Sequence, residues 1–598
     1  MKRLLLIIMP ALICGILLTS CGRNDEDVLS LIPIGSMDEN FQLFLLENFD
    51  VNKDGFISTE EAELIKEINC TLLYSIKSLD GLHYFPNLEK LYCAQNGIEK
   101  IDVSKNLKLN TLICNYNSIE KLDVSNNPAL ETLICNDQSI NTLKSIKINQ
   151  GLKTLDMRGH TLNSLDFRGN KSLKTLYCGG SELITLDVSN SALDSLDCTY
   201  YISSLVSLNI NECNSLKTLS VTNINSLALN CPQLENLTVE GPTGISNLDV
   251  SRCPLLKSLS FVGSFDHLDL SNNPDLEYVT IKVPSSSILG TIDVSKNYKL
   301  KNFEVALNGY AISTLKILDF SNHTALKSVS MRWEERRYAG VNPIELINLS
   351  WCSSLESLTV TNAGLKALNI SGCSALLTIN CISNQLTELN LHGCSKLKEL
   401  DCTRNHQLAT MVLTDCRELL TLMCTGGYLT ELDLEACTKI TELDCSENQL
   451  TRLKTNSKNL SKINCQFNAL TAIDILGNET LKQLQCNNNQ ISSLDLRGFS
   501  SLEEVICNHN PMTSLILGGC TALKNLNCEA CSLSTLDVSH CTVLDNLTCS
   551  YNQLKPSLDV SKCTKLTAIN CFYNPELTEL ILYCSAPYLL DQKSPVLK

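Results

Sequence analysis

The chain has 598 residues and a formal net charge of −16, from 48 Lys and Arg against 64 Asp and Glu. Because phosphate binding draws its affinity from clustered Lys and Arg, this balance argues against a nucleic-acid partner. Aromatic residues make up 5% of the chain and 31 residues are cysteines, which fits many small similar units better than one large globular interior.

The N-terminus has the pattern of an export signal. An apolar run from Leu4 to Leu18 follows two basic residues and is too short for a comfortable membrane span. The tetrapeptide Leu18-Thr19-Ser20-Cys21 resembles the lipobox of bacterial lipoproteins, in which the signal is removed and the new N-terminal cysteine carries a lipid. This resemblance implies a signal peptide over residues 1–20 and a lipid on Cys21; an ordinary signal peptide with a chance cysteine is the alternative.

The lipid is the one anchor that the sequence predicts. The acidic tether over residues 21–36 resembles the signals that send some lipoproteins to the outer face of the outer membrane. The C-terminal tail over residues 585–598 carries no membrane span or cell-wall sorting pattern. We therefore expect a surface-exposed, lipid-anchored protein of the bacterial outer membrane, with the periplasmic face as the alternative.

Residues 37–69 predict a helix-loop-helix cap. The end coil of a solenoid exposes an apolar face and needs such a cover. The apolar spacing predicts one helix with its inward residues at Phe41, Phe44, Leu45 and Phe49, over Glu39–Phe49. A second helix is predicted with its inward residues at Ala62, Ile65 and Ile68, over Thr59–Ile68.

The segment between these helices, residues 50–61, resembles the calcium loop of an EF-hand or a dockerin. It matches D-x-[DN]-x-[DN]-G-x5-E at every required position. The resemblance implies calcium ligands at Asp50, Asn52, Asp54, Phe56 through its carbonyl, Ser58 directly or through water, and Glu61. The alternative is a cap that keeps the pattern without the ion, as in internalin-like proteins. Only one loop is present where EF-hands usually work in pairs, so we expect calcium to stabilise the cap.

From about residue 70 to residue 584 the chain repeats a unit of about 21 residues. One coil runs Leu91-Tyr92-Cys93-Ala94-Gln95-Asn96 and then Ile101-Asp102-Val103-Ser104, and the next coil repeats it from Leu112. The pattern resembles the leucine-rich repeat family in the nested form L-x-x-L-x-C-x-x-N-x-L-x-x-L-D-L-x-x-N. This resemblance implies a β-rich solenoid of right-handed coils, with short parallel strands on both faces and the small α-helical cap at its N-terminal end.

Residues two apart in a strand point to the same side, so Leu91 and Cys93 are expected inward and Tyr92 outward. The asparagine after the first strand is expected to turn inward and bond the backbone of the tight bend. It recurs at Asn384, Asn405, Asn448, Asn468, Asn489, Asn510, Asn552 and Asn574. The cysteines fall mostly on two phases of the repeat, so we expect buried, reduced side chains that fill a narrow core.

Two surfaces are candidates for ligand binding. The first is a run of outward residues on the first strands of early coils, at Tyr92, Ile113, Ile134 and Tyr177. Strand propensity alone also favours such residues, which is the alternative.

The second candidate surface lies where three consecutive coils are longer between their two strands. Insertions at one phase are expected to emerge side by side at one edge, where repeat proteins often bind ligands. Tolerated loop growth is the alternative. The longest insertion carries an exposed cluster with the chemistry of a binding hot spot: Arg332, Trp333, Arg336, Arg337 and Tyr338.

No catalytic motif stands out, and the eight histidines are scattered. We therefore expect a non-enzymatic binding or adhesion protein that presents its solenoid to a protein or glycan at the cell surface. Two alternatives stay open: a glycan-binding lipoprotein of a nutrient-uptake system, and a parallel β-helix enzyme that degrades polysaccharide.

Overall fold

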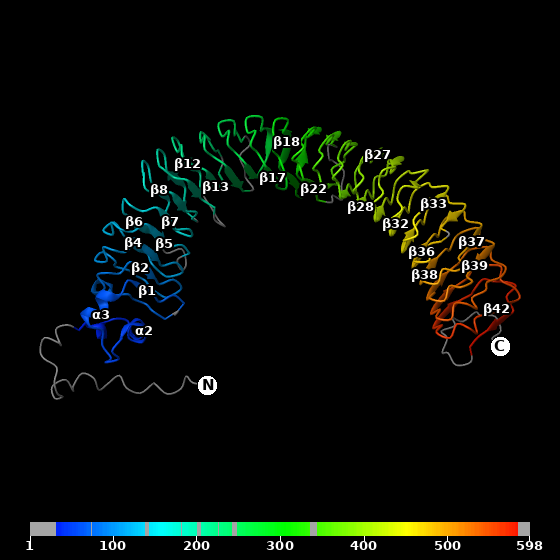
Figure 1. Cartoon of the computed structure of the whole chain (residues 1–598), viewed down its shortest axis with the longest axis horizontal. Helices are drawn as coiled ribbons and strands as arrows, with labels where there is room; N and C mark the ends of the chain where they lie inside the picture. Colours follow the sequence, from blue (N-terminus) through cyan, green and yellow to red (C-terminus); the bar gives the residue numbers. More distant parts are fainter. Residues whose placement is uncertain are drawn as a thin grey trace. The chain divides into compact units, whose positions relative to one another are not determined.

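The computed structural model is a solenoid of stacked coils with a strand on either face (Figure 1). It describes residues 31–72, 75–137, 143–180, 182–199, 205–224, 226–241, 248–334, 344–475 and 477–583. The chain divides into two compact units, residues 1–222 and 223–598. Among the described residues, no helix combines the length and the apolar character that crossing a membrane requires.

The cap has the first predicted helix and a shorter second one. Helix α2 spans Glu39–Phe49 as predicted, whereas α3 spans Thr59–Leu64 and ends before the predicted limit at Ile68. The backbone becomes extended at Ile65, and Glu67–Asn69 forms strand β1, which pairs with the first coil. Ile68 is buried as predicted, but it points inward from a strand because pairing with the next coil overrides the helical spacing. Two short 3-10 turns complete the helical elements, η1 (Ile34–Ser36) and η2 (Leu82–Tyr84).

The first unit has one sheet on its first face, which we call the first-strand sheet, and short sheets on its second face, the second-strand sheets. All pairings are parallel. The first-strand sheet of this unit contains β1 (Glu67–Asn69), β2 (Lys90–Tyr92), β3 (Thr111–Ile113), β5 (Thr132–Ile134), β7 (Thr154–Asp156), β9 (Thr175–Tyr177), β11 (Ser195–Asp197) and β13 (Thr218–Thr222). The second-strand sheets are β4 (Lys121–Asp123) with β6 (Ser145–Lys147), and β8 (Ser164–Asp166) with β10 (Thr185–Asp187) and β12 (Ser207–Asn209).

The second unit repeats this arrangement with more coils. Its first-strand sheet contains β14 (Asn236–Glu240), β15 (Ser258–Val262), β17 (Tyr278–Val283), β19 (Asn302–Leu307), β22 (Ser328–Trp333), β24 (Ser357–Thr361), β26 (Thr378–Asn380), β28 (Glu399–Asp401), β30 (Thr421–Met423), β32 (Glu442–Asp444), β34 (Lys462–Asn464), β36 (Gln483–Gln485), β38 (Glu504–Ile506), β40 (Asn525–Asn527), β41 (Asn546–Thr548) and β43 (Ala568–Asn570). Its second-strand sheets contain β16 (Phe265–Asp269), β18 (Ile288–Asp293) and β20 (Ile312–Ser313); β21 (Ile317–Asp319), β23 (Leu346–Asn348) and β25 (Ala367–Asn369); β27 (Glu388–Asn390) and β29 (Thr410–Val412); β31 (Asp433–Leu434), β33 (Leu453–Thr455) and β35 (Ile473–Asp474); β37 (Ser493–Asp495) and β39 (Ser514–Ile516); β42 (Ser557–Asp559) and β44 (Glu579–Ile581).

Side chains alternate along the short strands as the repeat predicts. Leu91 and Cys93 are fully buried and Tyr92 between them is half-buried. The predicted asparagine ladder is confirmed, as Asn489 illustrates. Its Nδ2 donates to the carbonyls of Cys465 and Cys486, both at 3.0 Å, and its Oδ1 accepts from the N–H of Leu470 at 3.0 Å. The other seven predicted asparagines make equivalent bonds.

The cysteines form two buried ladders. All 28 cysteines of the described residues are free thiols and all are buried. On the second ladder the thiol also acts as a donor: Cys520 Sγ lies 3.2 Å from the carbonyl of Leu496 in the preceding coil. Asn297 occupies the same repeat position and donates to the carbonyl of Leu270 at 3.0 Å. This position therefore selects small side chains that can donate to the coil behind.

In the described residues, part of the extra length of these coils lies in longer strands and not in loops, which corrects the prediction. Strands β17, β19 and β22 are each six residues long, against three in most coils. Their last residues, Val283, Leu307 and Trp333, are register partners and are buried. The inward-outward alternation simply continues, so much of the added sequence widens the core.

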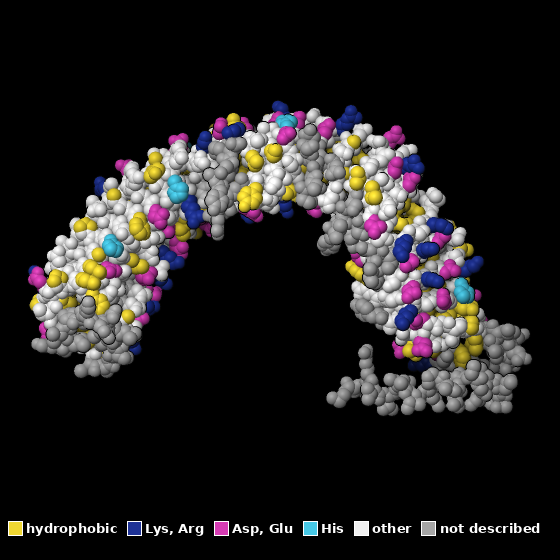
Figure 2. Space-filling view, turned by 180° about the vertical axis from the view of Figure 1, so that it is seen from behind, with side chains coloured by type: hydrophobic (Ala, Val, Ile, Leu, Met, Phe, Trp, Pro, Cys, Tyr) yellow, Lys and Arg dark blue, Asp and Glu magenta, His cyan; other side chains and the backbone are white. Residues whose placement is uncertain are grey.

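Charged side chains of both signs are interspersed over the face seen in Figure 2. Many pair across consecutive coils: Lys524 Nζ lies 2.7 Å from a carboxylate oxygen of Glu503, and Lys439 Nζ is 2.7 Å from one of Glu418. Such exposed pairs contribute little each, about 0.2–1 kcal/mol. They therefore support the stacking of coils and do not concentrate charge for a polyanionic ligand.

Candidate calcium loop and binding surface

Helix caps fix the two helices that flank the candidate calcium loop. Asp38 Oδ1 accepts from the N–H groups of Asn40 and Phe41 at 3.0 and 3.1 Å, and its Oδ2 accepts from the N–H of Lys77 at 3.0 Å. Ser58 and Glu61 form a capping box at the start of α3. The Asp38 carboxylate therefore both starts α2 and ties it to the first coil, as N-cap acids do.

The loop folds its acidic side chains toward its own backbone. The two oxygens of Asp50 accept from the N–H groups of Asp54 and Gly55 at 3.2 and 2.8 Å. Asn52 Oδ1 accepts from the same Asp54 N–H at 2.9 Å. Gly55 has a φ of +84°, which a residue with a side chain rarely adopts. The backbone turn that the sequence pattern predicts is therefore present.

Glu61 reaches back across the loop. Its Oε1 accepts from the N–H of Val51 at 3.0 Å, and its Oε2 accepts from the N–H and the hydroxyl of Ser58, both at 2.9 Å. Burial raises the pKa of Glu61, but the hydrogen bonds from Ser58 and Val51 outweigh it and leave the pKa below its usual value. Glu61 is therefore a carboxylate at neutral pH.

The donor set fits calcium, although its side chains are engaged with backbone groups. Carboxylate, amide, hydroxyl and carbonyl oxygens are the ligands that calcium prefers. In the described part of the chain, no three His, Cys, Asp or Glu side chains are arranged to hold a metal ion. The Glu61 carboxylate would therefore exchange its bonds to Val51 and Ser58 for the ion.

Residues just before the cap pair with the end of the loop. Leu31 forms an antiparallel bridge with Ser58, and the N–H of Ile32 donates to the carbonyl of Ile57 at 2.9 Å. Ile32 and Ile57 are both buried. The C-terminal part of the predicted tether is thus fixed to the candidate calcium loop, a contact that the sequence pattern did not reveal.

The first candidate binding surface is brought together in one row. Tyr92, Ile113 and Ile134 are successive register partners on β2, β3 and β5. The row continues through Asp156 on β7 to Tyr177 on β9. Each of the four predicted residues is half-buried, so three adjacent apolar side chains and one tyrosine line the outer side of this sheet. We call the five register partners the aromatic row: Tyr92, Ile113, Ile134, Asp156 and Tyr177.

Arg158 completes this row and was missed at the sequence level. Its guanidinium carbon lies 5.1 Å from the centre of the Tyr177 ring, and its Nε and Nη2 donate to Asp156 at 3.1 and 2.8 Å. The cation is thus held over the tyrosine ring by its bonds to Asp156. The spacing Asp-x-Arg could have revealed this ion pair in the sequence. Asp166 and Arg168, with the same spacing on the second face, form the same pair.

The second candidate surface is only partly described, and its tryptophan was wrongly predicted to be exposed. Trp333 is 3% exposed because it is the last inward residue of β22, in phase with Val329 and Met331. Arg332 is exposed on the opposite side of the strand. The predicted residues Arg336, Arg337 and Tyr338 lie outside the described residues, as do Cys21 and the predicted signal peptide.

A stacked tyrosine pair in the second unit also escaped the sequence analysis. The rings of Tyr551 and Tyr573 lie 4.2 Å apart at 14°, and the side chains are 51% and 68% exposed. Both residues have a positive φ at the position just before a ladder asparagine. The recurrence of a tyrosine at this position in two successive coils could have revealed the pair in the sequence.

The recurring aspartates of the Leu-Asp-Val-Ser motif close turns. Asp123 Oδ1 accepts from the hydroxyl and the N–H of Ser125 at 2.6 and 3.1 Å. These bonds, with one from Lys147, lower the pKa of Asp123 to about 2. Because equivalent bonds recur at Asp102 and Asp559, the aspartate belongs to the architecture of each coil.

Comparison with known proteins finds similarity among solved structures. No family model matches the chain, and no curated protein matches it. The functional domain of InlJ from Listeria monocytogenes, described as including a cysteine ladder, is 22% identical over 78% of this chain and 76% of that chain, with a TM-score of 0.33. YopM from Yersinia enterocolitica is 18% identical over 89% and 91%, with a TM-score of 0.37. The plant peptide hormone receptor RGFR1 in complex with RGF2 is 16% identical over 88% and 90%, with a TM-score of 0.48. The strand register and the burial pattern of this chain are those of a leucine-rich repeat solenoid.

Proposed function

We propose that the protein is a non-enzymatic, lipid-anchored binding protein of the bacterial cell surface, and that the aromatic row is its ligand surface. The observation that carries this proposal is the adjacency of Tyr92, Ile113 and Ile134 in one register row. Half-exposed apolar neighbours of this kind gain free energy when a partner covers them. Arg158 on Tyr177 adds a preordered cationic group at the end of the row, and Arg and Tyr are enriched in binding hot spots.

The test is binding of the ectodomain, residues 22–598, to parallel protein and glycan arrays. The variant Tyr92→Ser with Ile113→Asn and Ile134→Asn keeps strand length and changes only outward side chains. We expect a protein ligand whose binding falls at least tenfold in this variant, which corresponds to about 1.4 kcal/mol or more. Tyr428→Ser, an exposed tyrosine in the second unit, is the matched control. A ligand whose binding is indifferent to the triple variant would contradict the assignment.

We propose further that calcium binds at Asp50, Asn52, Asp54, Phe56, Ser58 and Glu61 and stabilises the cap. Bound calcium neutralises the carboxylates that converge in this loop. Ile57 at the end of the loop accepts a hydrogen bond from Ile32, and Asp38 at the start of α2 accepts one from Lys77 in the first coil. An ordered loop therefore stabilises both the segment before the cap and the contact of the cap with the first coil.

Calcium titration and thermal melting test this role. Asp50→Ala with Glu61→Ala should lower the melting temperature and remove its dependence on calcium. Glu60→Ala, an exposed neighbour outside the donor set, should retain that dependence. Equal melting of the unaltered protein in calcium and in chelator would refute the proposal.

The lipid anchor on Cys21 belongs to the same proposal and is tested separately. Cys21→Ala should abolish incorporation of labelled palmitate and release the protein from the membrane fraction. Cys14→Ala, within the apolar run, should leave both unchanged. Protease treatment of intact cells distinguishes the outer face of the outer membrane from the periplasmic face.

Glycan capture is the second candidate function, and the stacked pair Tyr551 and Tyr573 favours it. Exposed tyrosine rings offer an apolar face with a polar edge, which suits the faces of sugar rings. A glycan ligand lost in Tyr551→Ser with Tyr573→Ser, and kept in the triple variant of the aromatic row, would favour this function.

A further inference from the structure

The second-strand sheets of the first unit are interrupted between β6 and β8. At the next step the N–H groups of Ile184 and Thr185 donate to the carbonyl of Asn163 at 2.8 and 3.2 Å. The equivalent bonds, from Asn163 and Ser164 to the carbonyl of Lys144, are missing in this described stretch. The two strand edges therefore keep exposed peptide groups with which an added extended segment can pair.

At this step a histidine replaces a ladder asparagine. In an ordinary coil Asn117 reaches backward, with its Nδ2 donating to Cys93 and its Oδ1 accepting from Ile98. His160 occupies this position and is buried. Its Nδ1 accepts from the N–H of Leu162 in its own coil at 3.0 Å. The chain that leads into β8 is therefore not tied to the coil behind by this side chain.

The other ring nitrogen of His160 binds forward. His160 Nε2 lies 2.7 Å from the carbonyl of Cys178 in the next coil. Burial lowers the pKa of His160, so the neutral ring donates through Nε2 and accepts through Nδ1. A Cβ on Gly180 would lie 2.6 Å from His160 Cε1, so a glycine is needed there for the ring to fit. His160 therefore ties its coil to the next one, and the bond to the coil behind is left to Thr161, whose N–H lies 3.4 Å from the carbonyl of Leu143.

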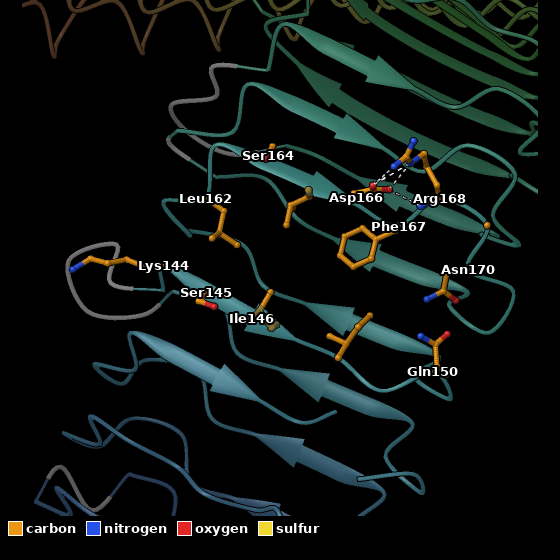
Figure 3. Close-up of a pocket in the computed structure, with 13 residues that line it drawn as sticks. Lys144, Ser145, Ile146, Gln150, Leu162, Ser164, Asp166, Phe167, Arg168 and Asn170 are labelled. Atoms are coloured by element: carbon orange, nitrogen blue, oxygen red, sulfur yellow. Dashed lines mark hydrogen bonds and ion pairs between the residues drawn. The ribbon is translucent and has the colours of Figure 1, made fainter. Parts of the chain in front are cut away.

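A cavity of about 460 Å³ opens at the interruption. Its apolar lining is formed by Ile146, Ile148, Leu162, Leu165 and Phe167 (Figure 3). These include core positions: Leu165 and Phe167 retain 8% and 9% exposure, against 1% and 0% for Leu186 and Val188 one coil further. The missing strand pairing therefore gives access to the hydrophobic core.

The rim of the cavity is polar and nearly balanced in charge. Arg168 holds Asp166, with Nε to Oδ1 at 2.9 Å and Nη2 to Oδ2 at 2.7 Å. The side-chain amides of Gln150 and Asn170 line the cavity (Figure 3), and Asn170 Oδ1 accepts from the N–H groups of Ser172 and Leu173 at 3.0 and 2.9 Å. Amides both donate and accept hydrogen bonds, so this part of the rim complements a neutral peptide group better than an isolated charge.

We propose that this cavity binds an extended peptide segment of a partner protein, with one large apolar side chain inserted between β6 and β8. The apolar lining accepts the side chain, and the unpaired groups of Asn163, Ser164 and Lys144 pair with the peptide backbone. A fatty acyl chain would satisfy the lining but none of these backbone groups. This site lies on the second face and is independent of the aromatic row.

The test uses capped peptides, Ac-Ser-Thr-Xaa-Thr-Ser-NH2 with Phe, Leu or Asn as the central residue, and the ectodomain, residues 22–598. Saturation-transfer difference NMR measures the contact of each peptide with the protein. We expect the Phe and Leu peptides to give signals at least tenfold stronger than the Asn peptide. N-methylation of the flanking peptide groups should weaken the Phe signal at least tenfold.

Two variants locate the binding. Leu162→Trp fills the cavity and should remove the Phe-peptide signal, whereas Ile184→Trp adds the same bulk at an unbroken step and should not. Ile146→Trp fills the cavity from β6 and should also remove the signal, which covers the case in which Leu162→Trp fails to fold. The proposal is overturned by absence of peptide binding, by binding that survives both cavity variants, or by binding of decanoate in place of the peptides.

Discussion

The second unit contains wide coils, residues 278–333, and narrow coils, residues 378–574. The two regions fill the interior of the solenoid with different side chains. In the narrow coils each first strand is short and most end on a buried cysteine followed by a ladder asparagine. In the wide coils the strands are six residues long and end on large apolar residues, and no cysteine occurs between Cys253 and Cys352. The narrow coils thus depend on buried hydrogen bonds and small thiols, and the wide coils depend on apolar bulk.

Alkaline pH should separate the two regions most strongly. Burial raises the pKa of Cys381 and of Cys486 to about 12, against about 8.5 for an exposed thiol. A folded-state pKa that is raised gives stability that is complete below the unfolded pKa and is lost as pH rises toward the folded pKa. The narrow coils, with many such thiols, should therefore become unstable between about pH 9 and pH 12.

Limited proteolysis with subtilisin between pH 8 and pH 10.5, under reducing conditions and with mass-spectrometric mapping, measures this loss. Cleavage should begin in residues 378–574 while residues 278–333 stay intact. Cleavage of both regions at the same pH would show that the thiols do not set the alkaline limit.

Removing apolar bulk should damage the wide coils next most strongly. Phe303 is buried and packs edge-to-face on Phe320, with ring centres 4.9 Å apart. Phe303→Ala should lower the free energy of unfolding by about 3–5 kcal/mol, because it removes a large side chain and leaves a cavity. Urea titration measures the change. Phe467→Ala, at an exposed position in the narrow coils, is the control and should change it by less than about 0.5 kcal/mol.

The same contrast explains which parts of the fold were predictable from the sequence. The ladder asparagines were predicted correctly because a residue such as Asn489 recurs in one phase and its role is local to the bend. The wide strands were missed because the insertions were counted as loop length, although Val329, Met331 and Trp333 keep the period of two. The periodic signal was present, and it placed the Trp333 ring inside.

The candidate sites were predictable to a smaller extent. The row from Tyr92 to Ile134 followed from the repeat register alone. The contact of Ile32 with Ile57 could not be predicted, because it joins a non-repeating segment to the loop through backbone groups. The gap at β6 and β8 could not be predicted, because the second-strand sheets are also interrupted at steps with ordinary ladder residues such as Asn384 and Asn489.

Loss of a ladder asparagine should destabilise the narrow coils somewhat less than Phe303→Ala destabilises the wide coils. Asn489→Ala leaves three carbonyls and the N–H of Leu470 without this partner in a buried bend. We expect the free energy of unfolding to fall by about 2–4 kcal/mol, since each unsatisfied buried group costs about 1–3 kcal/mol and neighbouring bonds partly compensate. Gln490→Ala, the exposed neighbour, is the matched control in the same urea titration. Equal effects of the two substitutions would mean that the ladder is not a stabilising element.

The smallest effect on stability is expected from Trp333→Phe. A structural role and a ligand-binding role of this ring make opposite predictions for ligand binding. Its ring is buried, and its Nε1 has no hydrogen-bond partner within the described part of the chain. Trp333→Phe therefore removes an unsatisfied donor while keeping an aromatic ring, so the gain offsets the lost volume and unfolding should change by less than about 1 kcal/mol. A purely structural ring also predicts that ligands found on the arrays bind Trp333→Phe with unchanged affinity. A tenfold loss of binding in this variant, with unfolding unchanged, would instead return Trp333 to the ligand surface and imply that the end of β22 opens when the ligand binds.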